Sequence, residues 1–204
     1  MLKRNITTVL FDLSEVYLQG LLGVENRMVK ILGMDKNKIY KQMHNQLLIS
    51  LFKGQINEDQ YLDNLIDING WNIKKNELKK IIRKNFKEIS GTRNIIKSLK
   101  KQNYKLGLIS VHAKEWVEFC EKKFKYRNLF KVILYSFNIG LLKDDKISFQ
   151  KVIKSLNSKP KETTFIDDSL DNIHTANKLG IIGIRFFTPK KLILDLEKLG
   201  IIIM

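Results

Sequence analysis

A short apolar run that ends at a carboxylate is the feature that most constrains this chain. Thr8–Phe11 is β-branched and apolar, and Asp12 follows it directly. Such a run is too short for a helix and is typical of a strand buried on both faces of a parallel sheet. In open α/β sheets, ligands bind at the carboxyl ends of the strands. Asp12 is therefore either a site residue or an ordinary polar residue at a strand end.

The second half of the chain alternates between apolar runs and amphipathic helices. After Gly91 and a basic helix, we expect strands at 105–111, 132–135, 163–166 and 181–187. Helices are expected around Trp116, around Phe149 and over 170–179. Strands that alternate with helices predict an α/β fold with a Rossmann-like parallel sheet covered on both faces.

The stretch that follows the first strand has a different pattern. Residues 21–86 have the apolar spacing of amphipathic helices and contain no convincing strand. One helix is expected to run from Asp35 to Leu51, and Asn57 with Gln60 resembles a capping box. The sequence therefore predicts an α/β core formed by residues 1–16 and 91–204, with a small all-helical domain at 17–90.

Composition excludes some classes of function. The net charge is +16, but arginine, the preferred residue for bidentate phosphate and base contacts, occurs at six positions among 37 basic residues. This predicts no specific nucleic-acid binding and leaves a general attraction for small anionic substrates. A single cysteine, Cys120, predicts a reducing cytoplasm. No apolar run approaches the ~20 residues that a membrane span needs, so no membrane partner is expected.

Polar chemistry follows each of the later strands. Ser110 ends one strand, Lys143 lies in the connection after the next, and Asp167 and Asp168 end a third. Because parallel strands share one carboxyl edge, these residues can converge on Asp12. The set would hold a carboxylate nucleophile, a hydroxyl donor, a cation and paired carboxylates. Oxygen ligands suit Mg²⁺, and phosphoryl transfer needs its charge neutralised by metal and lysine.

These four stretches, in this order, resemble the haloacid dehalogenase superfamily, most of whose members are Mg²⁺-dependent phosphatases. The resemblance covers essentially the whole chain, and FIDDSLDN followed by Ala176 and Gly180 is its most specific part. It implies that the helical stretch at 17–90 is the small helical cap of that family.

The resemblance also implies a role for each residue. Asp12 would attack phosphorus and become an aspartyl-phosphate, while Ser110 and the backbone N–H of Val111 hold the phosphoryl oxygens. Lys143 would balance charge between nucleophile and phosphate. The metal ligands would be Asp12, the backbone carbonyl of Ser14, Asp168 directly and Asp167 through water.

Ser14 departs from the phosphatase pattern, which has aspartate at this position to protonate the leaving group and then activate water. A lost general acid–base group typically costs 10²–10⁴-fold in rate. Glu15 would point the other way if extended geometry continued. Three hypotheses remain: a phosphatase of small phosphorylated metabolites, a non-catalytic phosphate- or Mg²⁺-binding relative, or a dehalogenase-like hydrolase.

The three histidines carry little further signal. His112 follows the Ser110 strand end and either faces the substrate or lies in a solvated loop. His44 and His174 fall in predicted helices and receive no role. With Cys120 they do not form a metal-ligand cluster.

Overall fold

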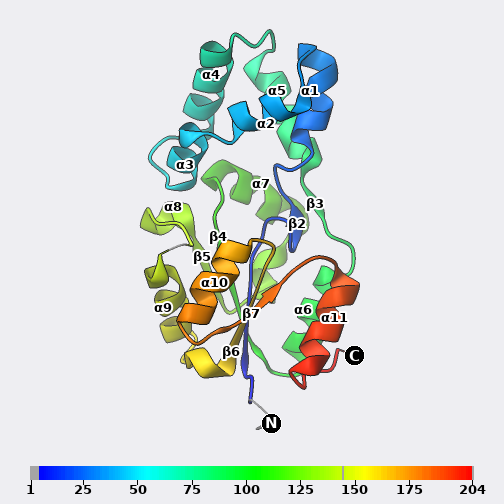
Figure 1. Cartoon of the computed structure of the whole chain (residues 1–204), viewed down its shortest axis with the longest axis vertical. Helices are drawn as coiled ribbons and strands as arrows, with labels where there is room; N and C mark the ends of the chain where they lie inside the picture. The colour runs from blue at the N-terminus through cyan, green and yellow to red at the C-terminus, as the bar shows by residue number, and fades with distance from the viewer. Residues whose placement is uncertain (1–4, 144, 204) are drawn as a thin grey trace.

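A five-stranded parallel sheet forms the centre of the computed structural model, which describes residues 5–143 and 145–203 (Figure 1). The strand order is β5-β4-β1-β6-β7. The strands are β1 (Thr8–Phe11), β4 (Lys105–Ser110), β5 (Val132–Tyr135), β6 (Thr163–Asp167) and β7 (Ile182–Arg185). The predicted fold class is confirmed, and the strand that ends at Asp12 is the central one.

The two faces of β1 belong to two separate parts of the core. Val9 and Phe11 lie in the cluster that also contains apolar residues of the helices on one face, whereas Leu10 belongs to the cluster on the other face. The helices of the first face are α6 (Thr92–Lys101), α7 (Lys114–Phe124) and α11 (Pro189–Lys198). The helices of the second face are α9 (Lys146–Ser155) and α10 (Leu170–Lys178). Helices on both sides explain why β1 is fully buried.

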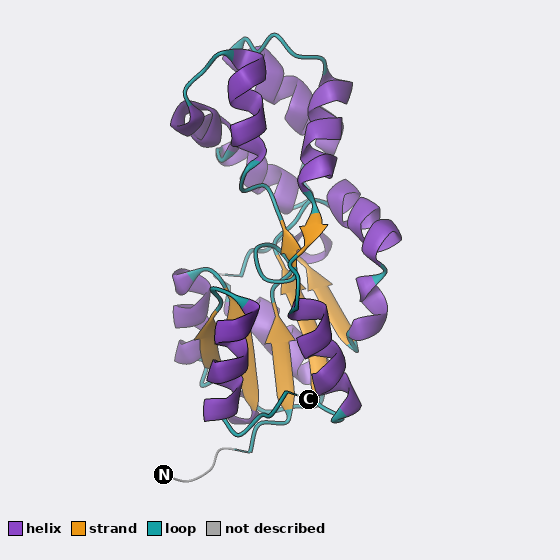
Figure 2. Cartoon of the chain, turned by 90° about the vertical axis from the view of Figure 1, so that its right-hand side faces the viewer, coloured by secondary structure: helices purple, strands orange, loops and turns teal. Residues whose placement is uncertain are grey.

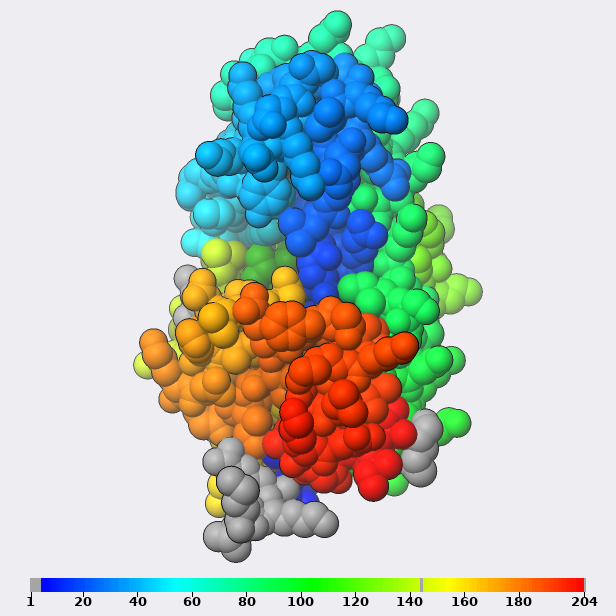
Figure 3. Space-filling model, turned by 45° about the vertical axis from the view of Figure 1, so that its right-hand side comes forward, coloured from blue at the N-terminus to red at the C-terminus, as the bar shows by residue number. Residues whose placement is uncertain are grey.

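A helical insertion lies beyond the carboxyl ends of the strands, apart from the sheet (Figure 2). Its helices are α1 (Val24–Leu32), α2 (Lys36–Met43), α3 (Gln46–Phe52), α4 (Glu58–Asn69) and α5 (Lys75–Asn85). The chain enters and leaves the insertion through two short antiparallel strands, β2 (Leu18–Gln19) and β3 (Lys87–Glu88). Figure 3 shows the insertion, in blue to cyan, above the orange and red helices α10 and α11.

Local sequence explains where these helices begin and end. The predicted capping box at Asn57 and Gln60 is present at the start of α4. The single helix expected from Asp35 to Leu51 is wrong, because the chain breaks between α2 and α3. Asn45 makes this break, since its side chain accepts hydrogen bonds from the first backbone N–H groups of α3.

Other elements were not predicted. The strands β2 and β3 have two residues each, which is too short for any apolar pattern. The helix α11 begins with a proline at its first position, where the missing N–H is not needed. The remaining short helices are α8 (Ser136–Ile139), η1 (Tyr126–Leu129) and η2 (Pro160–Glu162). None of the helices in the described ranges combines the length and apolar character required for crossing a membrane.

Buried polar contacts tie the insertion to the sheet domain. Glu58 in α4 is buried and accepts a 2.7 Å hydrogen bond from Trp116 Nε1 in α7. Within the insertion, Arg83 in α5 holds the same carboxylate in place through both of its terminal nitrogens. In addition, Ser136 Oγ donates to the Phe52 carbonyl at 2.5 Å. These contacts fix the insertion over the strand ends.

Candidate active site

Asp12 lies at the carboxyl end of the central strand. Its backbone N–H donates to Ile166 O at 2.9 Å, so the sheet pairing continues up to this residue. The side chain is buried, and its Oδ1 accepts from Leu13 N at 2.6 Å. Burial raises the pKa of Asp12 above its ordinary value; Lys143 opposes this rise and the charge of Asp167 adds to it.

Lys143 is a buried cation placed between two carboxylates. Its Nζ lies 2.5 Å from Asp12 Oδ1 and 2.8 Å from Asp167 Oδ2. Burial, the largest influence, lowers the pKa of this lysine, but the two carboxylates outweigh burial and raise it. Lys143 therefore stays charged, and it fixes the distance between two neighbouring strand ends.

The two aspartates at the end of β6 have different surroundings. Asp167 is fully buried and accepts hydrogen bonds from Ser169 N at 2.8 Å and from Asn172 Nδ2 at 3.1 Å, in addition to Lys143. Asp168 is half-buried, and burial followed by the charge of Asp167 raises its pKa. Asp167 is thus held by protein groups on both of its oxygens, whereas Asp168 faces the pocket.

These carboxylates fit a divalent cation. One oxygen each from Asp12, Asp167 and Asp168 lies within 4.8 Å of the others. Three carboxylates face one lysine, which leaves an excess of negative charge in a buried place. Carboxylate oxygens with room for water are the ligands that Mg²⁺ prefers.

Ser110 contributes a buried hydroxyl at the end of β4. Its Oγ makes no hydrogen bond to any residue in the described part of the chain. A buried hydroxyl without a partner costs about 1–3 kcal/mol, and such groups are rare unless they have a role in binding or catalysis. The next residue, Val111, is half-buried and lines the site pocket.

His112 is buried among aromatic rings rather than solvated in a loop. Its ring centroid lies 5.7 Å from Phe86 and 5.8 Å from Trp116. Burial lowers the pKa of His112 to about 4, so the ring is neutral at pH 7. Nδ1 accepts from Ala113 N at 3.0 Å, which assigns the proton of the neutral ring to Nε2.

The backbone turns sharply after Asp12. Tyr17 N and Leu18 N both donate to Leu13 O, and Glu15 has a left-handed φ of 58°. Extended geometry therefore does not continue, and the expectation that Glu15 points away from the site is wrong. Its carboxylate accepts from Gly20 N at 2.7 Å and lines the pocket beside Ser14.

A pocket of about 260 Å³ lies between these strand ends and the insertion. The sheet domain and the turn after β1 contribute Ser14, Glu15, Val111, His112, Trp116 and Asp168. The insertion and the segment leading into it contribute Leu21, Leu22, Tyr40, His44, Leu48 and Phe52. His44, to which the sequence assigned no role, thus belongs to the site pocket.

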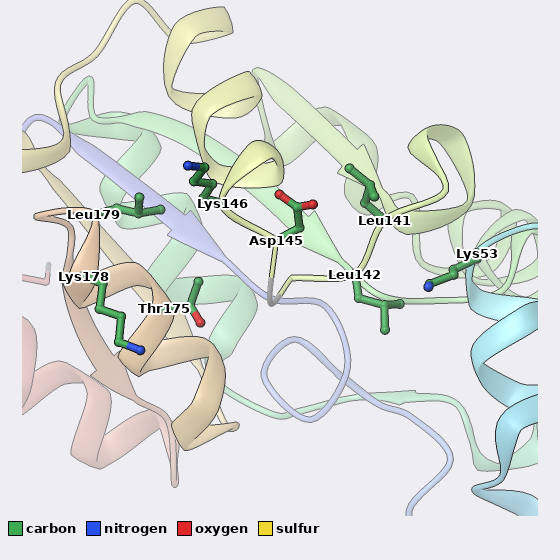
Figure 4. Close-up of a pocket in the computed structure, with 8 residues that line it drawn as sticks. All are labelled: Lys53, Leu141, Leu142, Asp145, Lys146, Thr175, Lys178 and Leu179. Atoms are coloured by element: carbon green, nitrogen blue, oxygen red, sulfur yellow. The ribbon is translucent and has the colours of Figure 1, made fainter.

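A second, larger pocket of about 610 Å³ lies beside α10 (Figure 4). Three lysines line it: Lys53 from the end of α3, Lys146 at the start of α9 and Lys178 at the end of α10. Lysine is therefore distributed unequally: three lysines line this pocket, none is among the described lining residues of the site pocket, and Lys143 lies buried at the strand ends.

Sequence reasoning missed the residues that support the site. Ser169 and Asn172 hold Asp167, and both belong to the stretch FIDDSLDN, so their positions at the start of a helix were a usable signal. Tyr40 and His44 are four residues apart in one expected helix, the spacing that places two rings together. This spacing indicated a contact between the rings but did not indicate what the pair faces.

The fold and the site together define a class, namely α/β proteins with an acidic, lysine-bridged pocket at the carboxyl edge of a parallel sheet. Residues 24–185 match the family model described as haloacid dehalogenase-like hydrolase, and the chain belongs to this family. The resemblance predicted from the motifs is confirmed at this level, and so is the assignment to the hydrolases.

Similar proteins cover different shares of the chain. The chain is 24% identical to the chloroplast flavin mononucleotide hydrolase 1 of Arabidopsis thaliana over 98% of its own length and 80% of that protein. It is 31% identical to the pyrophosphatase PpaX of Bacillus mycoides over 42% of its length, and it spans 40% of that relative. A haloacid dehalogenase family enzyme from Bacteroides thetaiotaomicron, solved with magnesium and inorganic phosphate, has a TM-score of 0.75 and 20% identity, covering 90% and 95% of the two chains.

Proposed function

We propose that this chain is a Mg²⁺-dependent phosphatase that acts on a small phosphorylated compound through an aspartyl-phosphate on Asp12. One observation carries the proposal. The unpartnered hydroxyl of Ser110 and the ammonium of Lys143 lie at neighbouring strand ends, beside the carboxylate of Asp12. A hydroxyl donor and a cation beside a nucleophile form a site for a phosphoryl group.

The residues that would hold Mg²⁺ are Asp12, Asp168 and the backbone carbonyl of Ser14, with Asp167 acting through water. The bonds from Ser169 and Asn172 to Asp167 support its indirect role, because they occupy its oxygens. When bound, the ion supplies positive charge next to the phosphoryl oxygens. The magnesium and phosphate in the Bacteroides enzyme support the same assignment here.

The residues of the chain perform the transfer in two steps. A carboxylate oxygen of Asp12 attacks phosphorus, and the bond to the leaving oxygen breaks as that oxygen departs with its electron pair. Ser110, the backbone N–H of Val111 and Lys143 balance the charge on the phosphoryl oxygens. Water then attacks phosphorus, releases inorganic phosphate and frees Asp12, while its proton passes to solvent.

Proton transfer is the weak part of this mechanism. Ser14 is too weak an acid to protonate the leaving oxygen, and Glu15 is held by its bond to Gly20 N. This feature favours the second candidate, a binding relative with little or no turnover. The dehalogenase alternative is less well supported, because the full aspartate pair suits a cation.

The helical insertion would act as a cap that closes the phosphate site from solvent. The relatives named above act on different phosphorylated compounds, which supports a small phosphorylated metabolite as the partner. No specific nucleic-acid partner is proposed, and a cytoplasmic location stays a prediction from the single cysteine.

Phosphate release with and without Mg²⁺ tests the proposal on 4-nitrophenyl phosphate. We expect Asp12→Asn to lower turnover by about 10³-fold or more, because the amide cannot attack phosphorus. Asp67→Asn, in which an exposed aspartate of α4 is changed, is the matched control and should behave as wild type. Turnover that persists in Asp12→Asn, or that needs no divalent cation, would reject the mechanism.

A further inference from the structure

The lining of the site pocket has an unusual composition for so basic a chain. None of its described lining residues is lysine or arginine, although the chain contains 37 of them. The charged side chains that line the pocket are the carboxylates of Glu15 and Asp168, and because Asp168 is assigned to Mg²⁺, Glu15 supplies the charge that faces the rest of the substrate. A second anionic group on the substrate would therefore meet negative charge without a partner, which is a strongly unfavourable arrangement.

Aromatic rings line the insertion side of this pocket. Tyr40 and His44 stack with their centroids 4.0 Å apart and their planes 20° apart. Tyr40 remains 38% exposed, so part of its side chain is left uncovered by the fold. Phe52 from the insertion and Trp116 below it add two more aromatic surfaces. Aromatic rings bind other flat rings by stacking and edge contacts, in addition to the burial of apolar area.

The volume of the pocket limits what can bind. An apolar cavity of about 150 Å³ is enough for benzene, so about 260 Å³ leaves room for one substituted ring. The chemistry of the site points in the same direction. Because Ser14 cannot donate a proton, the site favours leaving oxygens that depart as weak bases, as a phenol does more readily than an aliphatic alcohol.

We propose that the substrates of this site are aryl phosphates, in which the phosphate is attached to a single uncharged aromatic ring. The ring would lie against the Tyr40–His44 stack, and the phosphate would point toward Asp12 and Lys143. This inference rests on the proposed function. It adds a substrate class and excludes compounds whose leaving group carries a second anion.

A pair of substrates of similar shape tests the charge argument. Phenyl phosphate and 4-carboxyphenyl phosphate differ by one carboxylate. That carboxylate makes the phenolate released from the second compound the better leaving group. We expect kcat/KM to favour phenyl phosphate by about 10-fold or more, a preference that leaving-group chemistry alone would reverse.

Two lysine substitutions provide a matched comparison. Leu22 lines the pocket and is 44% exposed, whereas Ile31 in α1 is 41% exposed and lies outside the pocket. Both substitutions add the same charge to the chain. Leu22→Lys should narrow the preference for phenyl phosphate by about 5-fold, since it offers the carboxylate a partner. Ile31→Lys should leave the preference unchanged.

Equilibrium binding separates this inference from the proposed function, because phosphonates are not hydrolysed. With Mg²⁺ present, benzylphosphonate should bind about 10-fold more tightly than methylphosphonate, and Tyr40→Ala should remove most of that difference without weakening methylphosphonate. Equal affinities, or no binding of either compound, would overturn the substrate class. Ring-dependent binding without turnover would support recognition of an aromatic ring while rejecting the phosphatase. Equal turnover of phenyl phosphate and 4-carboxyphenyl phosphate would support the phosphatase while rejecting the substrate class.

Discussion

The two walls of the site pocket differ in how they are built. The strand-end wall is backed by buried charged groups that the sheet fixes: Lys143 contacts two carboxylates, and one of them is also held by Ser169 and Asn172. The insertion wall is apolar and aromatic, and Leu22 and Tyr40 remain partly open. The difference indicates that the sheet determines the reaction, whereas the helical insertion determines which leaving group can enter.

This comparison predicts that changes to the strand-end aspartates alter every substrate equally, whereas changes in the insertion wall alter discrimination between substrates. It would fail if a substitution among the strand-end aspartates changed substrate preference without changing metal binding.

Asp168→Ala should abolish Mg²⁺ binding measured by calorimetry, with a loss of at least about 100-fold in affinity, because each direct ligand matters in an octahedral site. Asp171→Ala is the control, since Asp171 is an exposed aspartate in the first turn of α10. Undiminished affinity in Asp168→Ala would reject the assignment of direct metal ligands. An equal loss in the control would indicate that charge near α10, rather than coordination, holds the ion.

Ser14→Asp should raise turnover by about 10- to 100-fold, because it restores a general acid and base beside Asp12. The gain should be larger for an alkyl phosphate than for an aryl phosphate, since the alkyl leaving oxygen needs the proton more. In wild type, slow attack by water should let the aspartyl-phosphate on Asp12 accumulate, where rapid quenching and mass spectrometry detect it.

The exposed Ser155 at the end of α9 provides the control for this substitution. Ser155→Asp should leave both rates unchanged. A gain of equal size for both classes of substrate would mean that proton transfer is not what Ser14 lacks. Continued inactivity of Ser14→Asp, with Mg²⁺ and phosphate still bound, would favour the binding relative.

Much of the strand-end wall could be predicted from sequence, for a topological reason. Parallel strands place their carboxyl ends on one edge, so residues as far apart as Asp12 and Asp167 meet without any knowledge of packing. Lys143 contacts both carboxylates because Asp12 and Asp167 lie at this same edge, on neighbouring strands. The helical insertion was predictable as helices, because Asn57 and Gln60 mark a helix start by local chemistry.

The insertion wall could not be predicted in the same way. Its shape depends on where helices break and how they pack, and Asn45 divides a pattern whose apolar spacing is continuous. Glu15 illustrates the same limit, since its left-handed backbone turns the carboxylate into the pocket. Helix packing allows many arrangements for one apolar pattern, whereas a parallel sheet allows few.

The smallest predicted effect concerns His112, which lies where the two walls meet. Its pKa is about 4 in the folded protein against an ordinary value of 6.5, because burial disfavours the charged ring. Between these values the unfolded chain binds a proton that the folded chain does not, so stability falls as the pH is lowered from 7 toward 4. Linkage gives a loss of about 2 kcal/mol in the free energy of unfolding between pH 7 and pH 5 from this group.

Urea unfolding of wild type, His112→Gln and His174→Gln at both pH values isolates that contribution. Other groups whose pKa differs between the folded and the unfolded chain, Asp12 among them, are common to all three proteins and cancel in the comparison. His112→Gln should lose about 2 kcal/mol less than wild type on acidification, whereas His174→Gln, a change at an exposed histidine of α10, should follow wild type. If all three proteins lose stability equally, His112 is not held neutral by burial, and the junction between the two walls is more open to water than its aromatic surroundings indicate.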